Sequence, residues 1–306
     1  MHETQGDWLP ARAALHPTGL YFSLREIAAA ELQDAFMQET IARVGGRESV
    51  VQVAREDLGK GADGCAPAGI IFHVARCGST LVSQLLKQAD GLVVYAEPLP
   101  VNEILRPPHA WPRSELVAAL RSLGIAFSRH AIGPYVLKLT SWNTLYCDIV
   151  ADAFPETPWV FCIRDPVEVA VSLLNQPPGW LTEFAPIVDR EVASASREEF
   201  VARLYGSLCD AAARLDPARG LLLPYDRLPA SVWEVAAPHF SRPIERDTQA
   251  RMSAAAARNS KSPLGTESKF DDDSGAKRAA ASGELLRAVD RLARPQLQAL
   301  ERRFES

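Results

Sequence analysis

The sequence of 306 residues lacks the cysteine and histidine patterns that mark metal sites and disulfide frameworks. Its five cysteines are odd in number and widely spaced, and no two of them form a Cys-x-x-Cys pair. Its six histidines are equally scattered, without a His-x-His or a His-Glu-x-x-His motif. These absences predict no structural metal and no disulfide framework, and they fit a protein of the reducing cytoplasm.

The chain also lacks an excess of positive charge and any long apolar run. Lys and Arg number 33 against 38 Asp and Glu, which gives a formal net charge of -5. A generic nucleic-acid-binding protein is normally basic, so we expect no nucleic-acid partner. The longest apolar runs, near Val160 and Leu221, have the length of strands and are too short to span a membrane. The first ten residues, MHETQGDWLP, do not have the pattern of a secretory signal.

What the sequence does have is a regular alternation of short apolar runs with amphipathic stretches from about residue 67 onward. The runs of strand length lie at residues 69–74, 91–95, 135–139, 159–163 and 220–224. The clearest helical pattern between them covers residues 196–215 and begins with a capping-box sequence. Strands that alternate with helices predict a three-layer α/β/α fold with a central, mostly parallel sheet, similar to a P-loop fold.

We divide the chain into two parts, residues 1–66 and 67–306. The first part is an amino-terminal extension of mixed structure, for which a short strand is expected at 20–24 and a helix at 24–44. The second part is the α/β domain.

Three further segments of the α/β domain stand out. A long loop at 175–195, which contains Trp180 and Phe184, is a candidate lid or binding element. The polar segment at 254–282 is expected to be mobile. The last amphipathic helix, at about 283–304, should be kinked or broken by its proline.

The first chemical motif follows the strand expected at 69–74 and reads Arg76-Cys77-Gly78-Ser79-Thr80. At such a strand-to-helix turn the backbone N–H groups point at one place beside a helix N-terminus, which makes an anion site. Gly78 permits close approach of the backbone, the two hydroxyls add donors, and Arg76 adds positive charge. The motif is not a Walker A loop, because no Lys precedes Ser79. It is not a phosphatase loop either, because no Arg stands six residues after Cys77.

A second motif, Arg164-Asp165-Pro166, follows the strand expected at 159–163. Asp165 is a good N-cap and Pro166 suits the first position of a helix. Ser172 lies seven residues beyond the cap, which is close to two helical turns, so it shares the face of the helix start. A guanidinium and a hydroxyl are thereby predicted to converge on a second anion.

Together the two motifs resemble the sulfotransferases that use 3′-phosphoadenosine 5′-phosphosulfate (PAPS). In that family a strand–loop–helix of the form [KR]-x-G-[ST]-T binds the 5′-phosphosulfate, and here this is the turn from Arg76 to Thr80. An Arg-[Asp/Asn]-Pro strand–helix with a Ser eight residues after the Arg binds the 3′-phosphate, which the resemblance assigns to Arg164 and Ser172. The resemblance covers about residues 68–228 and implies that residues 67–306 form a sulfotransferase-like domain.

Two later features extend the resemblance. A Tyr-acidic-x-Leu stretch follows a later strand in the family, and here it is the sequence YDRL that begins at Tyr225, whose ring is expected to approach the adenine. A late basic loop closes over the cofactor in the family, and the resemblance gives this role to Arg258 and Lys261.

The resemblance is closer to the bacterial and tyrosylprotein-type members than to the cytosolic members. Many cytosolic members have a Trp directly after the first loop, where this chain has Leu81. They also have a catalytic His two residues after a Lys on the third strand, where this chain reads Lys138-Leu139-Thr140. In the bacterial and tyrosylprotein types a Glu after the second strand is the base, and Glu97 occupies that place.

The resemblance implies transfer of a sulfuryl group from PAPS to an acceptor hydroxyl or amine, with release of adenosine 3′,5′-bisphosphate (PAP). Arg76 and the amides of its turn would stabilise the departing 5′-phosphate, and Lys138 would contact the sulfonate. Glu97 would accept the acceptor's proton as general base. Arg164, Ser172 and the late basic loop would distinguish PAPS from ATP. No metal is expected, the acceptor is expected to be a small molecule or a peptide, and an oligomer stays possible.

Two other functions stay open on the sequence. One is an ATP-dependent P-loop kinase of a small molecule, and the other is a non-catalytic nucleotide-binding relative. Individual residues also have plainer interpretations: Glu97 as a loop carboxylate, Lys138 as a solvated strand-end lysine, and Asp271 to Asp273 as a solvated run. We expect His73 to be a packed core residue and Cys77 to contribute only its backbone.

Overall fold

The computed structural model describes residues 8–16, 19–44, 50–58, 64–107, 111–181, 196–257 and 274–305. Within them the chain forms a five-stranded parallel sheet with helices on both faces and a separate three-stranded antiparallel sheet. The predicted three-layer α/β/α architecture is therefore confirmed.

The five strands of the central sheet lie in the order β5-β6-β4-β7-β8, so the strand that precedes the first motif is in the middle. Every strand pair in the sheet is parallel. β4, β6 and β7 are buried along their whole length, which explains why they are nearly continuous apolar runs in the sequence. The strands are β4 (Gly69–His73), β5 (Val93–Ala96), β6 (Tyr135–Lys138), β7 (Trp159–Ile163) and β8 (Gly220–Pro224).

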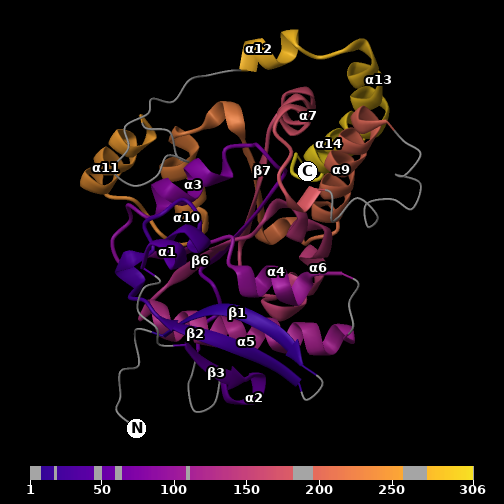
Figure 1. Cartoon of the computed structure of the whole chain (residues 1–306). Coiled ribbons are helices and arrows are strands. Elements are labelled where there is room, and N and C mark those ends of the chain that lie inside the picture. Colours follow the sequence, from indigo (N-terminus) through magenta and orange to yellow (C-terminus); the bar gives the residue numbers. More distant parts are fainter. Residues whose placement is uncertain are drawn as a thin grey trace.

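Helices cover both faces of this sheet. Figure 1 shows α3, α10 and α11 on one side of it and α4, α6 and α9 on the other. The helices of the α/β part are α3 (Ser79–Leu86), α4 (Leu99–Leu105), α5 (Arg113–Ala131), α6 (Cys147–Ala153), α7 (Pro166–Asn175), α9 (Arg197–Ala212), α10 (Ala237–His239), α11 (Arg246–Ala256), α12 (Ser274–Ala279), α13 (Gly283–Leu292) and α14 (Arg294–Arg302).

The starts of two helices follow the capping signals in the sequence. The Asp165 carboxylate accepts hydrogen bonds from the backbone N–H groups of Val167 and Glu168 at the start of α7. The Ser196 hydroxyl accepts a hydrogen bond from the backbone N–H of Glu199 at the start of α9. The predicted break of the last helix also occurs, because α14 begins with Pro295 in its first turn.

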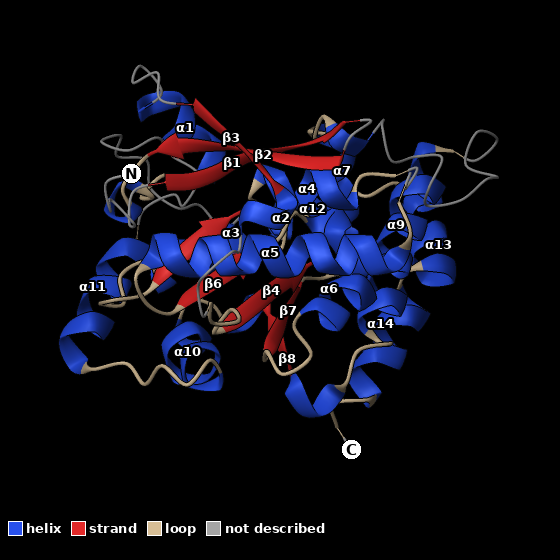
Figure 2. Cartoon of the chain, turned by 90° about the horizontal axis from the view of Figure 1, so that it is seen from below, coloured by secondary structure: helices blue, strands red, loops and turns tan. Residues whose placement is uncertain are grey.

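The amino-terminal part forms the antiparallel sheet β1-β2-β3, made of β1 (Trp8–His16), β2 (Gly19–Glu26) and β3 (Val50–Ala54). The sheet contacts α4 and α5, which lie between it and the central sheet (Figure 2). Two short helices, α1 (Met37–Val44) and α2 (Arg55–Leu58), and a 3-10 turn, Ala29–Glu31, complete this part.

The prediction for residues 20–44 is correct in one half and wrong in the other. The strand expected at 20–24 is present as part of β2. The helix expected from residue 24 is wrong up to residue 36, because Leu24 and Arg25 pair with Val51 and Val50 of β3. This pairing partner is distant in the sequence and overrides the apparent helical spacing. The boundary between residues 66 and 67 stays a prediction.

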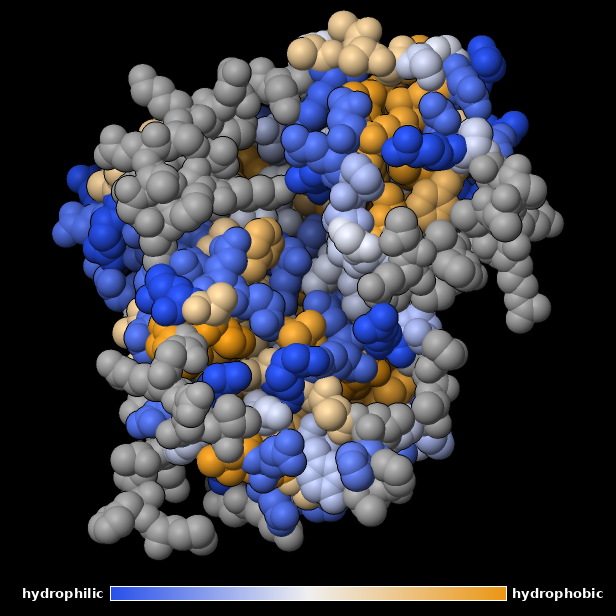
Figure 3. Space-filling view, viewed as in Figure 1, coloured by the Kyte–Doolittle hydropathy of each residue, from blue (hydrophilic) through white to orange (hydrophobic). Residues whose placement is uncertain are grey.

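The segment at 254–282, expected to be mobile, includes the end of α11 and all of α12. The intervening residues lie outside the described part of the chain, and the mobility stays a prediction. Within the described ranges, no helix has both the length and the apolar character that crossing a membrane requires. On the face shown in Figure 3, hydrophilic residues are spread widely and hydrophobic residues gather near α7 and α13.

Candidate active site

The candidate residues lie at one edge of the central sheet. Because all five strands are parallel, their carboxyl ends meet at the same edge, where ligands of such sheets bind. The first motif follows β4, Glu97 follows β5, and Lys138 is the last residue of β6. Arg164 follows β7 and Tyr225 follows β8. The topology thus brings together residues that are far apart along the chain.

The turn between β4 and α3 requires glycine at position 78 for two reasons. Gly78 has a φ of 83°, in the left-handed region that favours glycine. A Cβ atom at this position would also lie 2.8 Å from Leu228 Cδ1 and 2.9 Å from Tyr225 Cδ2. The turn is therefore packed directly against the residues that follow β8, and α3 begins at the next residue with its N-terminal N–H groups at the turn.

Arg76 sits in the same turn, and its side chain reaches α7. Its Nη2 atom donates to the carbonyl oxygen of Gln176 at 2.8 Å and to the Gln176 Oε1 atom at 3.2 Å. The backbone N–H of Gln176 in turn donates to the carbonyl oxygen of Ser172. The structure thus places the Arg76 guanidinium beside the end of α7 that carries Ser172. Ser172 itself is half-buried on this helix.

Cys77 of this turn forms a buried group with His73 and Cys162. Both ring nitrogens of His73 lie 2.8 Å from a backbone carbonyl oxygen, those of Val74 and Leu139, as suits a packed core residue. Burial raises the pKa of the Cys77 thiol, but hydrogen bonding with Cys162 and His73 outweighs it and brings the pKa well below its usual value. The hydrogen bond with Cys77 and burial raise the pKa of Cys162. Cys77, which belongs to the turn, is thereby linked to β4 through His73 and to β7 through Cys162.

Arg164 joins the second motif to the first. Its Nη1 atom donates to the carbonyl oxygen of Arg76 at 3.4 Å. Its guanidinium lies over the ring of Tyr225, 3.9 Å from the ring centre, and this ring is the one that packs against Gly78. The hydroxyl of Tyr205 on α9 donates to the Arg164 carbonyl oxygen at 2.8 Å. Arg164, Tyr225 and the Gly78 turn therefore form one connected group.

A carboxylate that sequence reasoning missed completes this group. Glu168, on the first turn of α7, is buried and accepts a hydrogen bond from Arg164 Nε at 2.6 Å. A second hydrogen bond, from Arg278 Nε on α12, reaches its other oxygen at 2.7 Å. Burial raises the pKa of Glu168, but the hydrogen bonds from Arg164 and Arg278 outweigh it, so the net pKa is lowered. Ser274 on α12 also accepts a hydrogen bond, from Arg164 Nη2 at 3.0 Å.

On the other side of the turn, Glu97 and Lys138 form an ion pair. The Lys138 side chain is about 1% exposed, whereas the Glu97 side chain is 24% exposed. The backbone N–H of Glu97 donates to the carbonyl oxygen of Lys138 at 2.7 Å, which fixes the two strand ends together. The structure therefore brings together the two residues for which the sequence predicts roles as general base and sulfonate contact.

The amino-terminal part reaches this pair, and no motif indicated that it would. The ring of Phe36 lies 5.1 Å from Lys138 Nζ. The carbonyl oxygen of Asp34 accepts hydrogen bonds from the side chains of Gln84 and Lys87 on α3 and just beyond it. Burial lowers the pKa of Lys87 to about 8; the Asp34 carboxylate opposes this and the Lys138 charge adds to it. A second lysine thus stands near the ion pair.

Left-handed backbone conformations mark two of the candidate residues. Among the described residues, four non-glycine residues have a positive φ, namely Arg76 (60°), Glu97 (54°), Ile132 (51°) and Ser241 (55°). Such a conformation costs about 1–3 kcal/mol and persists where the surrounding structure holds it, often at functional sites. This conformation occurs at Arg76 and Glu97, each shortly beyond a strand of the sheet. It supports a functional role for both residues independently of any motif.

Some sequence-predicted residues are not brought into the site by the described structure. Arg258, Lys261, Phe184 and the run from Asp271 to Asp273 lie outside the described residues. Trp180 is half-buried and lies in a helical stretch that begins five residues after the end of α7. Leu81, in the place of the aromatic residue of many cytosolic sulfotransferases, is buried in the core.

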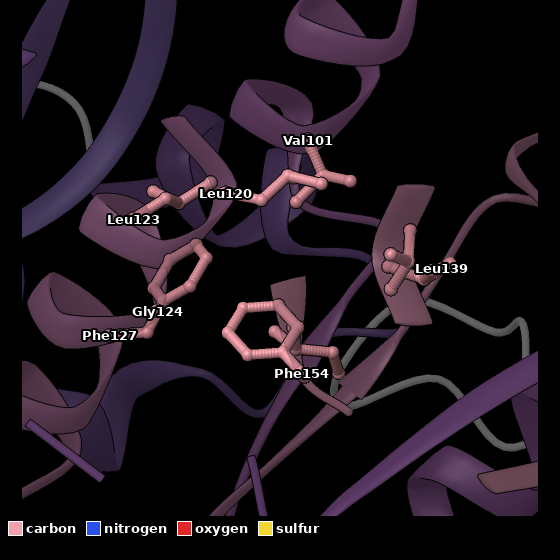
Figure 4. Close-up of a pocket in the computed structure, with 9 residues that line it drawn as sticks. Val101, Leu120, Leu123, Gly124, Phe127, Leu139 and Phe154 are labelled. Carbon is pink, nitrogen blue, oxygen red and sulfur yellow. The ribbon is translucent and has the colours of Figure 1, made fainter. Parts of the chain in front are cut away.

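An apolar cavity lies behind the site, between α4, α5, α6 and β6 (Figure 4). Its volume is about 10 Å³, which is the room of about one water molecule. Figure 4 shows the rings of Phe127 and Phe154 directed toward it, with Leu139 on the opposite wall. A cavity of this size is a packing void and does not admit an acceptor.

Solved structures similar to this chain are sulfotransferases. The sulfotransferase domain of the olefin synthase from Synechococcus PCC 7002 is 13% identical, with a TM-score of 0.50 over 80% of this chain and 96% of that one. A sulfotransferase from Mycobacterium avium is 15% identical, with a TM-score of 0.49 over 80% of this chain and 77% of that one. A sulfotransferase from Alicyclobacillus acidocaldarius is 14% identical, with a TM-score of 0.43 over 79% and 96%.

Neither the protein-family models nor the curated protein sequences give a match to this chain. The likeness to the Synechococcus domain shows that the chain has the fold of a sulfotransferase domain. A fold hosts many functions, so the function must be argued from the site.

Proposed function

We propose that this chain is a sulfotransferase that moves a sulfuryl group from PAPS to an acceptor hydroxyl or amine and releases PAP. The observation that carries the proposal is one continuous set of contacts. The Gly78 turn packs against Tyr225, and the Tyr225 ring lies 3.9 Å below the Arg164 guanidinium. The turn that we propose as a backbone anion site thus lies near an arginine, and this arrangement supports binding of the two phosphate groups of a single nucleotide.

The chemistry of the residues suits such a nucleotide. The turn supplies backbone N–H groups at the start of α3, where the helix dipole favours an anion. Arg164 supplies a planar guanidinium, and an arginine of this kind binds phosphate through paired hydrogen bonds. The Tyr225 ring contacts both groups, and in this proposal it lies near the adenine. In this proposal Arg76, Ser79 and Thr80 hold the 5′-phosphate, with Arg258 and Lys261 as further cofactor ligands.

The acceptor side of the proposed reaction is carried by Glu97 and Lys138. Glu97 is held in a left-handed conformation and its carboxylate is partly exposed, as a general base needs in order to reach an acceptor hydroxyl. Lys138 is buried against that carboxylate, and in this proposal its positive charge stabilises the negative charge that develops during sulfuryl transfer. Bound PAPS supplies the sulfuryl group. In this proposal Glu97 accepts the proton of the acceptor, and Lys138 stabilises the developing negative charge.

Thermal unfolding with added nucleotides tests the proposed cofactor. A ligand that binds only the folded chain at 100 times its Kd stabilises it by about 2.7 kcal/mol. We expect PAP to raise the melting temperature and ATP with Mg²⁺ to leave it unchanged. The reverse result would support the kinase alternative, for which this chain lacks the Walker A lysine.

Sulfate transfer from PAPS to a panel of phenols, alcohols, amines and tyrosine peptides tests the proposed reaction. We expect transfer to at least one member of the panel by the wild-type chain. Binding of PAP without transfer to any acceptor would favour the non-catalytic relative.

A further inference from the structure

The short helix α12 docks on the site, although no motif predicted it. It lies at the top of the molecule in Figure 1 and contacts α7, the helix that begins after Arg164. Two of its side chains make polar contacts there. Ser274 accepts a hydrogen bond from Arg164 Nη2, and Arg278 donates from Nε to Glu168.

Glu168 binds two arginines in the same way. Its Oε2 atom accepts from Arg164 Nε at 2.6 Å, and its Oε1 atom accepts from Arg278 Nε at 2.7 Å. Each guanidinium is thus held at its Nε edge by one oxygen of a single carboxylate. A planar guanidinium that is held at this edge keeps a fixed orientation of its two terminal nitrogens, which are the donors that grip phosphate.

The charges of this cluster do not balance. Two guanidinium groups face one carboxylate, so the cluster of Arg164, Arg278 and Glu168 has an excess of one positive charge. The Glu168 side chain is only 3% exposed, whereas the Arg278 side chain is 64% exposed. The surplus charge of these three residues therefore faces solvent from α12, while the N-terminal N–H groups of α7 are capped by the Asp165 carboxylate.

We propose that Glu168 is a positioning residue that holds Arg164 and Arg278 as a pair, and that Arg278 is a direct ligand of the 3′-phosphate of PAPS. This inference rests on the proposed function, and it adds residues that neither the motifs nor the fold comparison assign. The buried Arg164 is the fixed half of the pair. The exposed Arg278 is the other half, and it lies on α12, 110 residues after Glu168 along the chain.

The plainer explanation is that Arg278 only anchors α12 to α7. The two explanations differ in one measurable quantity, the gain in affinity that the 3′-phosphate contributes. Adenosine 5′-monophosphate (AMP) has the same base, ribose and 5′-phosphate as PAP but no 3′-phosphate. The ratio of PAP affinity to AMP affinity therefore isolates the 3′-phosphate, and an anchor without phosphate contact would leave this ratio unchanged.

The test is isothermal titration of PAP and AMP into the full-length chain and its Arg278→Gln, Arg278→Lys and Glu168→Gln variants. The matched control is Arg12→Gln, because Arg12 is a similarly exposed arginine (62%) that is paired with a mostly buried glutamate, Glu103. We expect Arg278→Gln to lower the PAP:AMP ratio about tenfold or more, since a hydrogen bond to a charged group is lost. Arg278→Lys should restore part of the ratio, and Arg12→Gln should change it by less than about twofold.

Glu168→Gln should lower the same ratio, and its effect should shrink in the Arg278→Gln background because the two residues act on one phosphate. An unchanged ratio in Arg278→Gln, with AMP binding intact, would overturn the role of Arg278. An unchanged or raised ratio in Glu168→Gln would overturn its positioning role. If wild-type chain binds AMP as tightly as PAP, the proposed function itself fails, and the inference fails with it.

Discussion

The two sides of the candidate site are built in different ways. The proposed nucleotide side consists of the Gly78 turn, Arg164 and Tyr225, which all follow strands of the central sheet and form one connected group. The proposed acceptor side consists of the Glu97–Lys138 pair, and the ring of Phe36 from the amino-terminal part lies over Lys138. Short motifs describe the first side well because each of its residues follows a strand of one parallel sheet. The second side depends on a part of the chain that has no recognisable motif, and this is where an acceptor would be selected.

The largest expected effect separates chemistry from nucleotide binding. Glu97→Gln should lower the rate of sulfate transfer by about 100- to 10,000-fold, because the general base is lost. PAP affinity should be unchanged, since Glu97 lies on the acceptor side. Single-turnover transfer and PAP titration measure the two quantities. Glu156→Gln, an exposed carboxylate that pairs with Arg219, is the control and should behave as wild type.

Full activity of Glu97→Gln would show that the base assignment is wrong. A loss of both transfer and PAP binding would mean that the two sides of the site are not separable in the way the structure indicates.

The second effect concerns the nucleotide side alone. Gly78→Ala places a Cβ within 3 Å of both Leu228 and Tyr225 and forces a residue with a side chain into a φ of 83°. We expect PAP affinity to fall and the free energy of unfolding to drop by about 1–3 kcal/mol. Gly91→Ala is a matched control, because Gly91 also has a positive φ (68°) but a Cβ there meets nothing within 4 Å.

Both glycine variants carry similar backbone strain, so only Gly78→Ala should lose PAP binding. Equal PAP affinity in the two variants would contradict the close packing of the turn against Tyr225.

The third prediction is a pH dependence on the acceptor side. Burial lowers the pKa of Lys87 to about 8, below its value in the unfolded chain, so the unfolded state binds more protons between the two values. The free energy of unfolding should therefore be reduced below pH 8 and rise as the pH increases from about 8 to 10.5, by about 3 kcal/mol.

Lys87→Met removes this titration. As the pH rises from about 8 to 10.5, the free energy of unfolding of the wild type should therefore increase relative to that of the variant. Urea unfolding at several pH values measures it. Parallel pH profiles for the two chains would refute the prediction.

The smallest expected effect concerns the proposed acceptor side. Phe36→Leu keeps an apolar side chain over Lys138 but removes the aromatic face, whose interaction with the ammonium is worth about 0.5–2 kcal/mol. We expect the acceptor KM to rise by a few-fold, about what 1 kcal/mol corresponds to, while PAP affinity stays as in wild type. Steady-state kinetics with varied acceptor measure this change. A change in PAP affinity without a change in acceptor KM would show that Phe36 acts on nucleotide binding and would contradict its assignment to the acceptor side.

Much of the fold was predictable because burial leaves a clear mark on the sequence. Strands that are buried on both faces become nearly continuous apolar runs, and the five runs identified in the sequence are the five strands of the sheet. The helix expected from residue 24 was wrong because β3, some 25 residues away, pairs with that segment. Local spacing does not reveal such a partner.

The residues of the candidate site were likewise predictable only in part. Arg76, Gly78 and Arg164 follow strands, so a parallel sheet brings them together. Glu168 was available to sequence reasoning, because it stands in the first turn of the helix that Asp165 and Pro166 predict, four residues after Arg164. Arg278 was not, because its approach depends on how α12 docks on α7 in three dimensions.

The most direct test of the central claim is a crystal structure of the chain with bound PAP. The account predicts that the 5′-phosphate lies within hydrogen-bond distance, about 3 Å, of the backbone N–H groups at the Gly78 turn. It predicts that the 3′-phosphate of the same molecule contacts the Arg164 guanidinium, with the adenine near Tyr225. A PAP molecule that reaches only one of these two places, or that binds elsewhere, would contradict it.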